Sequence, residues 1–197
     1  KQNEYNSYNK PWVATIHGGG SESNTDWINA AKYNPHIICV SKFVANRINN
    51  TAYVHACSNP DEFIYKEQKQ NYFLYFTSLD WGFQKGLGIF INIAKKFKKY
   101  DFIIAGKTNN QELINFINNI CQVEKNIKYV GEQNGKEKAE LFANAKAYIL
   151  PTQLADACPT TISEALMSGT PVIGSVNGSL PEIVPNDCGI LCKNESD

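Results

Sequence analysis

Two carboxylates separated by seven residues stand in the stretch DACPTTISEALMSGTPVIG, at Asp156 and Glu164. Pro159 suits the first turn of a helix, because the N–H group that proline lacks would be unpaired there in any case. The unpaired N–H groups of residues 160–162 would then point out of the helix, where the helix dipole also favours negative charge. The stretch therefore predicts an anion site, such as one for phosphate, between the two acids.

The two acids flank this anion site from opposite sides. Glu164 lies about one turn into the helix, where it can accept hydrogen bonds from vicinal hydroxyls, as acids in nucleotide-binding folds do with ribose. Asp156 lies in the loop before the helix. A ligand with hydroxyls at both ends and phosphate between them, such as a nucleotide sugar, fits this arrangement. The alternative left open is that Asp156 is a helix-cap acid and Glu164 an exposed helical residue.

Two basic side chains also follow predicted strands. Lys85, in the loop LDWGFQKG, stands at the start of a predicted helix, where the helix dipole disfavours a cation. A diphosphate in the crevice would explain that placement, and a solvated surface lysine is the alternative. His17 ends the strand WVATIH and precedes three glycines, which allow close approach of backbone or ligand. We keep both a catalytic and a structural role open for His17.

Composition narrows the class of partner. Nineteen basic and nineteen acidic residues give no net charge, so bulk electrostatics favours neither nucleic acid nor an anionic membrane surface. The sequence contains no apolar run long enough to span a bilayer and no signal peptide, which predicts a cytoplasmic protein. The cysteines form no metal-binding spacing and are expected to be free thiols. They are Cys39, Cys57, Cys121, Cys158, Cys188 and Cys192.

Short apolar runs alternate with helical patterns along most of the chain, which predicts a parallel sheet with crossover helices. The polar stretch 64–70 is the expected boundary between domains 1–66 and 67–197. Strands are expected at 12–17, 36–41, 53–57, 71–78, 101–106, 126–131, 147–151, 171–175 and 189–192. Helices are expected at 42–48, 85–99, 110–123, 136–144, from 159 onward and at 180–184. The second domain is thus a doubly wound α/β fold, whose ligands bind beyond the carboxyl ends of the strands.

The signature region DACPTTISEALMSGTPVIGS, followed by GSLPEIV, resembles the E-x7-E region of the retaining glycosyltransferases of family four, within group 1. The segments WVATIHG, ICVSKFVANRI, YVHACSNPDEF, YFTSLDWGFQKG and IKYVGEQNGKEKAELFANAKAYILPT agree with that family in order. The resemblance implies the GT-B fold, which has two facing Rossmann-like domains. It also implies that the chain holds the end of the first domain and most of the donor-binding second domain, truncated at both ends.

The resemblance assigns roles to individual residues. It implies that Glu164 holds the donor ribose and that Asp156 approaches the transferred sugar. It implies that Lys85 stabilises the departing diphosphate and that His17 lies near the reacting sugar. The helix start at Pro159, Thr160 and Thr161 is implied to bind phosphate and sugar through backbone N–H groups, which Pro159 itself lacks. Backbone groups in the stretch 130–133 are expected to recognise the base, and this stretch includes Val130 and Glu132.

Two departures from the family pattern bear on activity. The first acid of the signature is Asp156, one methylene shorter than the usual glutamate. Leu79, or Ser78 if the loop is gapped, stands where the family has an arginine six residues before its lysine. Half of the expected diphosphate clamp is therefore missing.

The function that follows from the resemblance is transfer of a sugar from a nucleotide-diphosphate sugar to an acceptor hydroxyl, with retention and without a metal ion or cofactor. The implied acceptor is a glycan or a lipid-linked precursor in surface glycan or polysaccharide synthesis, with peripheral membrane association of the full-length protein. A non-catalytic sugar-nucleotide or glycan binding module and a sugar-nucleotide epimerase on a similar fold remain alternatives. A dehydrogenase is disfavoured, because no GxGxxG follows the strand expected at 71–78.

Overall fold

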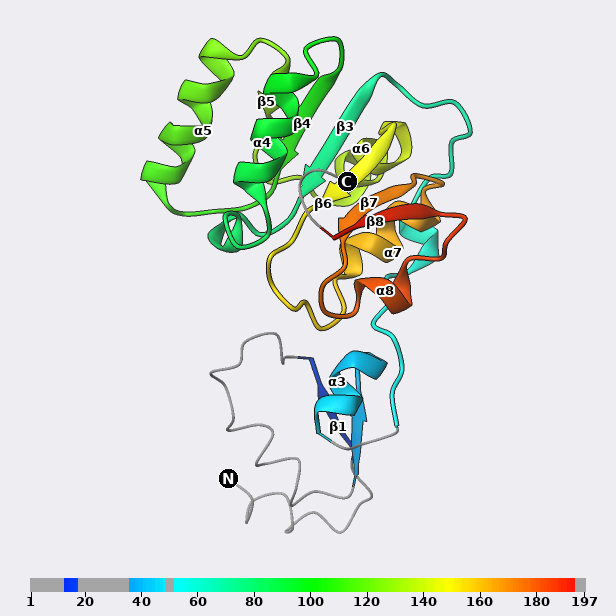
Figure 1. Cartoon of the computed structure of the whole chain (residues 1–197). Helices are drawn as coiled ribbons and strands as arrows, with labels where there is room; N and C mark the ends of the chain where they lie inside the picture. The colour runs from blue at the N-terminus through cyan, green and yellow to red at the C-terminus, as the bar shows by residue number, and fades with distance from the viewer. Residues whose placement is uncertain (1–12, 18–35, 49–51, 194–197) are drawn as a thin grey trace.

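The computed structural model describes residues 13–17, 36–48 and 52–193. The described part divides visibly into a small N-terminal portion and a larger portion built around a six-stranded sheet (Figure 1). The three glycines that follow His17 lie outside the described residues. No helix among the described residues is long and apolar enough to cross a membrane.

The N-terminal portion contains two short parallel strands and one helix. Strands β1 (Ala14–Ile16) and β2 (Ile37–Cys39) lie within the ranges expected from the sequence, and they pair in parallel. Helix α3 (Lys42–Arg47) follows, and the Ser41 side chain caps it by accepting from the Val44 N–H group. The prediction of a third strand at 53–57 is wrong. This segment makes only an isolated bridge to Cys39, because the chain leaves the sheet edge after one residue.

The large sheet has six parallel strands in the order β5-β4-β3-β6-β7-β8, which confirms the predicted doubly wound sheet. All six strands expected from the sequence are present: β8 has the expected bounds, and the other five are shorter by one to three residues. Their bounds are β3 (Tyr72–Phe76), β4 (Asp101–Ala105), β5 (Ile127–Tyr129), β6 (Ala147–Leu150), β7 (Val172–Ser175) and β8 (Gly189–Cys192).

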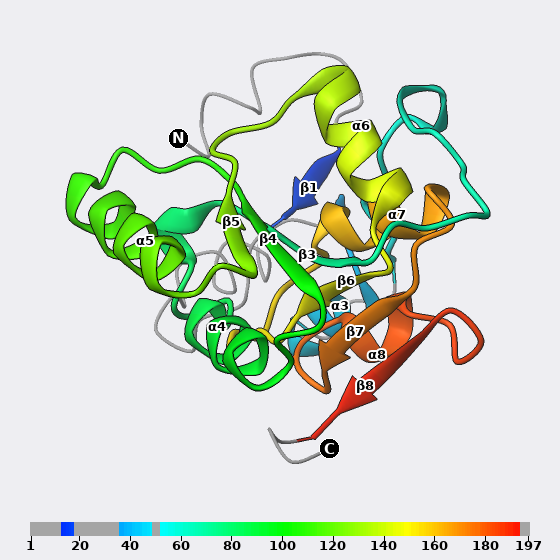
Figure 2. The ribbon, with the colours of Figure 1, turned by 90° about the horizontal axis from the view of Figure 1, so that it is seen from above.

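Helices cover both faces of this sheet, as Figure 2 shows from above. Helices α4 (Leu87–Lys96) and α5 (Gln111–Val123) pack on one face. Helices α6 (Gly135–Asn144), α7 (Thr160–Met167) and α8 (Leu180–Ile183) pack on the other. The short 3-10 helices η1 (Pro60–Glu62) and η2 (Leu79–Trp81) lie in the loops before and after β3.

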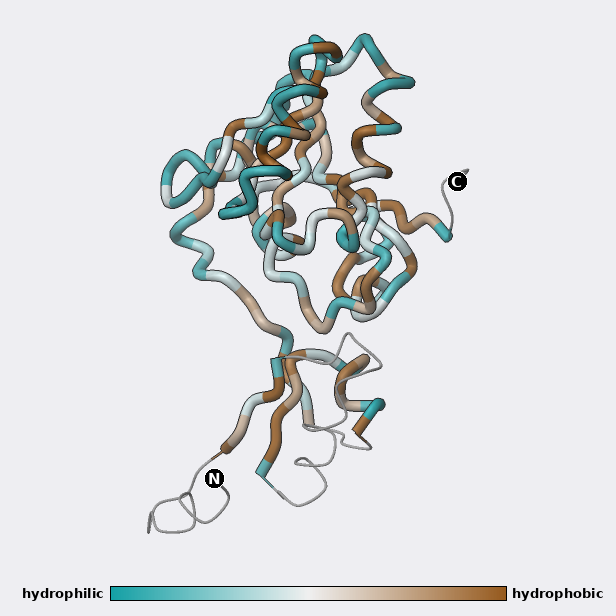
Figure 3. The backbone as a smooth tube through the Cα atoms, turned by 90° about the vertical axis from the view of Figure 1, so that its left-hand side faces the viewer, coloured by the Kyte–Doolittle hydropathy of each residue, from teal (hydrophilic) through white to brown (hydrophobic). Residues whose placement is uncertain are grey.

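Alternate residues of β3 serve two separate hydrophobic clusters, because successive side chains of a strand point to opposite faces. Tyr72, Leu74 and Phe76 pack with α6, α7 and α8, whereas Phe73 and Tyr75 pack with α4 and α5. The strand is apolar throughout because both faces are covered. Figure 3 shows hydrophobic and hydrophilic residues alternating along the surrounding helices, as expected for elements with one buried side.

One helix begins later than its sequence pattern indicates. We expected a helix from Lys85 to residue 99, but α4 starts at Leu87 and ends at Lys96. Gly86 precedes it with φ +87°, and a Cβ there would lie 2.1 Å from the Pro151 carbonyl oxygen. Lys85 therefore lies in a turn pressed against the end of β6, rather than in the helix.

The boundary expected near residue 66 remains a prediction. Phe63 already packs on the cluster around Phe142, with its ring 6.5 Å from the Phe142 ring. Lys66 pairs with Glu140 of α6 at 2.6 Å. The segment before β3 therefore lies along the large portion.

Replacing Phe142 by alanine tests the packing on the α6 side. The ring is fully buried and touches the rings of Phe63, Phe76 and Tyr148. Phe142→Ala should lower the free energy of unfolding by about 3–5 kcal/mol, measured by urea denaturation. Phe97→Ala is the matched control, because that ring is half exposed, and it should change stability by less than about 1 kcal/mol. Equal losses in both variants would contradict the described core.

Candidate functional site

A polar cavity of about 350 Å³ opens at the carboxyl edge of the sheet, between the loops that follow β3 and β6. It brings together six of the residues singled out from the sequence, from segments far apart in the chain. They are His17, Lys85, Asp156, Pro159, Thr160 and Thr161. The rest of the lining consists of Phe76, Thr77, Ser78, Ala157 and Cys158. The carboxyl-edge location is the one that the doubly wound topology predicts.

Lys85 and Asp156 form an ion pair across this cavity. Lys85 Nζ lies 3.1 Å from Asp156 Oδ1, and the two side chains are 20% and 13% exposed. The ion pair with Asp156 explains why Lys85 can stand just before α4, where the helix dipole disfavours a positive charge. Asp156 Oδ2 is buried and has no hydrogen-bond partner among the described residues. The cavity thus contains a partly buried ion pair, in which one oxygen of the Asp156 carboxylate has no hydrogen-bond partner among the described residues.

The start of α7 supplies hydrogen-bond donors to the same cavity. Pro159 occupies the N-cap position, one residue before the helix rather than in its first turn. The N–H groups of Thr160 and Thr161 have no partner among the described residues. The third expected donor is not free, because the Ile162 N–H group bonds to the Pro159 carbonyl oxygen at 3.1 Å. Two N–H groups and the positive end of the helix dipole therefore face the cavity.

A buried tyrosine underlies the helix start. The Tyr148 hydroxyl lies 2.8 Å from Thr161 Oγ1 and 3.0 Å from the Phe76 carbonyl oxygen. Burial raises the pKa of Tyr148, and the negative charge of Asp156 adds to the rise. The phenol therefore stays protonated at neutral pH and links the end of β3 to the first turn of α7.

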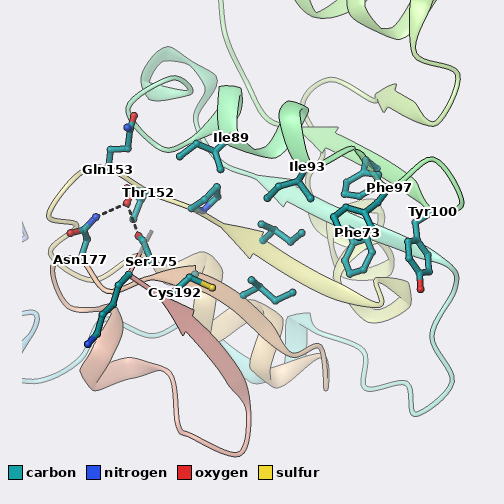
Figure 4. Close-up of a pocket in the computed structure, with 16 residues that line it drawn as sticks. Phe73, Ile89, Ile93, Phe97, Tyr100, Thr152, Gln153, Ser175, Asn177 and Cys192 are labelled. Carbon is teal, nitrogen blue, oxygen red and sulfur yellow. Dashed lines mark hydrogen bonds between the residues drawn. The ribbon is translucent and has the colours of Figure 1, made fainter. Parts of the chain in front are cut away.

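The loop that carries Asp156 is held by the loop after β7. The Thr152 carbonyl oxygen accepts from Ser175 Oγ at 2.5 Å and from Asn177 Nδ2 at 2.8 Å (Figure 4). The Ser179 N–H group donates to the Asp156 carbonyl oxygen at 2.9 Å. Gly178 has φ +58°, and a Cβ there would lie 2.4 Å from that same oxygen. Contact this close requires glycine.

Glu164 lies one turn into α7 and is not part of the cavity lining. It is 4% exposed, so it is not the exposed helical residue of the alternative interpretation. Its Oε1 accepts from Lys138 Nζ at 2.7 Å and from Ser58 Oγ at 3.1 Å. Its Oε2 is buried without a partner among the described residues.

The two residues expected near the base lie beyond the end of β5, away from this cavity. The Val130 N–H group bonds to the Ile104 carbonyl oxygen, and the Val130 carbonyl oxygen accepts from Gln133 Nε2 at 2.7 Å. Glu132 is exposed and lies 3.7 Å from Lys107 Nζ. Their role in base recognition stays a prediction.

A larger cavity of about 660 Å³ lies elsewhere, on the sheet face between α4 and strands β6 to β8. Figure 4 shows it lined mainly by apolar side chains such as Ile89, Ile93 and Phe73. It holds none of the predicted site residues. The predicted residues that line a cavity are thus gathered at the smaller, polar one.

Sequence reasoning missed Lys138 and Ser58. Lys138 stands four residues before buried Phe142 on α6, so its inward position follows from helical periodicity. A lysine on the apolar side of a helix was the signal that could have revealed it. Nothing in the sequence marks Ser58, because its contact with Glu164 joins residues 106 positions apart.

The six-stranded parallel sheet, with a polar cavity at its carboxyl edge, defines a doubly wound α/β protein. The sequence model for "Glycosyl transferases group 1" matches residues 59–197, well over half of the chain. The chain belongs to the group 1 glycosyltransferases, and its fold is of the GT-B type.

The chain is similar to several known proteins at low sequence identity. It is 24% identical over 115 residues to one subunit of human phosphatidylinositol N-acetylglucosaminyltransferase, a match that covers 56% of this chain and 24% of that protein. Sucrose-phosphate synthase from Thermosynechococcus elongatus superposes with a TM-score of 0.78 at 16% identity, covering 99% of this chain and 58% of that one. Anabaena Alr3699/HepE in complex with UDP and glucose superposes with a TM-score of 0.73 at 15% identity, covering 94% and 58%. The chain thus spans a little over half of these solved structures.

Gly178→Ala tests whether the loop after β7 positions Asp156. The added Cβ must displace the Asp156 backbone, which carries the partner of Lys85. We expect a loss of stability clearly above the roughly 1–2 kcal/mol of a left-handed alanine, measured by thermal unfolding. Gly135→Ala is the matched control, because Gly135 has φ +50° and nothing within 4 Å of its Cβ position. Indistinguishable losses in the two variants would show that the close approach at Gly178 is unimportant.

Proposed function

We propose that the protein is a retaining, metal-independent glycosyltransferase that moves a sugar from a nucleotide-diphosphate sugar to an acceptor hydroxyl. The observation that carries the proposal is the single cavity in which Lys85 and the unpaired N–H groups of Thr160 and Thr161 converge. A diphosphate bound there can pair with the Lys85 ammonium group and accept hydrogen bonds from the start of α7. Such donors stabilise the negative charge that develops on a departing diphosphate without requiring a metal ion.

Each part of the donor is proposed to contact a different set of residues. The diphosphate lies between Lys85 and the start of α7, and the transferred sugar lies toward Asp156 and His17. Glu164 binds the ribose, and backbone groups near Val130 and Glu132 contact the base. The solved structures of Alr3699/HepE with UDP and with UDP-glucose support a nucleotide-sugar donor, because their fold is similar to that of this chain. The proposed acceptor is a glycan or lipid-linked precursor, reached in the cytoplasm at or near a membrane.

Donor binding must change the charge pairing between Lys85 and Asp156. Lys85 is neutralised by Asp156, so a diphosphate meets a pair of net charge zero and competes with a carboxylate for one ammonium group. Binding must therefore draw Lys85 toward the phosphates and leave Asp156 nearer the sugar. This exchange of partners gives the two residues opposite effects on diphosphate affinity.

A non-catalytic binding module is the second candidate function, and one observation favours it. Leu79 is 1% exposed in the core beneath α4, so it adds nothing to the cavity, and Ser78 contributes only a hydroxyl there. Lys85 is therefore the only lysine or arginine that lines the cavity among the described residues. The module would bind the donor as proposed but would not transfer its sugar.

Two substitutions of similar size test the charge balance. Lys85→Met should weaken binding of a nucleoside diphosphate by at least about tenfold, because a charged hydrogen bond is lost. Asp156→Asn should instead strengthen binding by roughly fivefold, about 1 kcal/mol for releasing a partly shielded ion pair. Affinities for UDP, GDP and ADP, measured by ligand-observed NMR without metal, check both expectations.

Sugar transfer by the full-length protein separates the two candidate functions. If Asp156→Asn binds UDP, GDP or ADP more tightly but loses transfer, the glycosyltransferase proposal stands. Binding without transfer in the unaltered protein would favour the binding module. Weaker binding in Asp156→Asn would contradict the assigned exchange of partners.

A further inference from the structure

We propose that Lys138 is a positioning residue, which holds the Glu164 carboxylate in the orientation that offers one oxygen to the donor ribose. Lys138 lies on α6 and does not line the cavity, so it acts through Glu164 rather than on the ligand. The inference rests on the proposed function, in which Glu164 binds the ribose. Lys138 lies outside the signature stretch that contains Asp156 and Glu164.

Glu164 is the only charged residue that is buried among the described residues. An ionised carboxylate is costly to bury unless it is paired and hydrogen-bonded. Lys138 Nζ at 2.7 Å and Ser58 Oγ at 3.1 Å both bind Oε1, and neither binds Oε2. The two oxygens are therefore unequal, because one is saturated by the protein and the other is left for a hydroxyl donor.

The ammonium group of Lys138 is itself held in place. It lies 5.4 Å from the ring centroid of Phe76 and 5.9 Å from that of Phe63, within range of cation–π attraction. Phe76 ends β3 and also lines the cavity. The side chain is 24% exposed, so water screens the ion pair only in part. Lys138 therefore presents a fixed charge to Glu164.

Lys69 also points into the protein, and its contacts are those of a lysine with a structural role only. Lys69 Nζ donates to the carbonyl oxygens of Ala143 and Ser168 and to Thr170 Oγ1, which ties together the ends of α6 and α7. All three acceptors are neutral and belong to the framework. Lys138 instead faces a carboxylate with an unused oxygen. Replacing a buried ion pair by apolar residues is often neutral or stabilising, so stability alone does not explain this pair.

The two partners of Glu164 differ in origin. Lys138 comes from α6, which packs in the same hydrophobic cluster as α7. Ser58 comes from the irregular segment before η1, and its hydroxyl offers the same chemistry as a ribose hydroxyl. A ribose hydroxyl can therefore bind Oε2, which has no partner among the described residues, while Lys138 holds Oε1.

The discrimination between ribose and deoxyribose tests this role, because a structural lysine would not affect it. Affinities for UDP and GDP are compared with those for their 2′-deoxy forms by calorimetry. The unaltered chain should prefer the ribose form by at least about tenfold, the value of a hydrogen bond to a charged group. In Lys138→Met the preference should fall to within about twofold. Lys138→Arg should keep it, since the positive charge remains.

Control variants test whether a change in ribose preference is specific to Lys138. Lys136→Met removes an exposed lysine from the same helix and should leave the preference unchanged. Thermal unfolding checks that each variant is folded, and Lys138→Gln, which keeps a neutral donor, replaces Lys138→Met if the latter does not fold.

Three results would overturn the inference in different ways. An unaltered chain that binds UDP or GDP with a ribose preference, together with a Lys138→Met variant that keeps the same preference, would remove the role of Lys138 and leave the donor site standing. An unaltered chain that binds neither nucleotide, or binds ribose and deoxyribose forms equally, would remove the ribose role of Glu164 and this inference with it. If Lys138→Met instead bound the ribose form more tightly, Lys138 would be a competitor for Glu164.

Discussion

The pairing of β3 with β6 fixes where the site can form. These strands are neighbours in the sheet, yet the chain leaves β3 toward α4 on one face and leaves β6 toward α7 on the other. Their loops therefore diverge and leave a crevice at the carboxyl edge, as in other doubly wound sheets. The crevice receives Lys85 from one loop and Asp156 from the other, and the start of α7 opens into it. Glycine at 86 and at 178 allows neighbouring backbones to hold these loops at close contact.

Charge compensation follows from that geometry. Two carboxylates, Asp156 and Glu164, lie partly or fully out of water, and each is matched by one lysine. In both pairs one carboxylate oxygen remains buried without a partner among the described residues. Unsatisfied buried oxygens are uncommon in folded proteins. We propose that a ligand with hydroxyl groups supplies the missing partners of these two oxygens.

The sequence predicts most of the fold correctly, because the spacing of apolar residues is regular within each element and the alternation of strands and helices repeats along the chain. Each strand from β3 to β8 is a short apolar run, and each intervening helix shows one buried side, so neighbouring elements support one another. The errors fall where a single local contact decides the outcome, as at 53–57 and at the start of α4, where the approach of Gly86 to Pro151 sets the boundary. Within the site, chain order placed Asp156 and Thr160 together. It did not reveal that Lys85 pairs with Asp156, or that Lys138 and Ser58 reach Glu164 from distant segments.

We propose that the polar cavity, and not the larger apolar one, binds the diphosphate. Backbone amide shifts of the ¹⁵N-labelled chain, followed during titration with UDP and with GDP, test it most directly. We expect the largest saturable shifts with at least one of them at Thr160 and Thr161, whose N–H groups have no partner in the described structure. Largest shifts at Ile93 and Ile173, which line the apolar cavity, or no saturable shift at the start of α7, would contradict it.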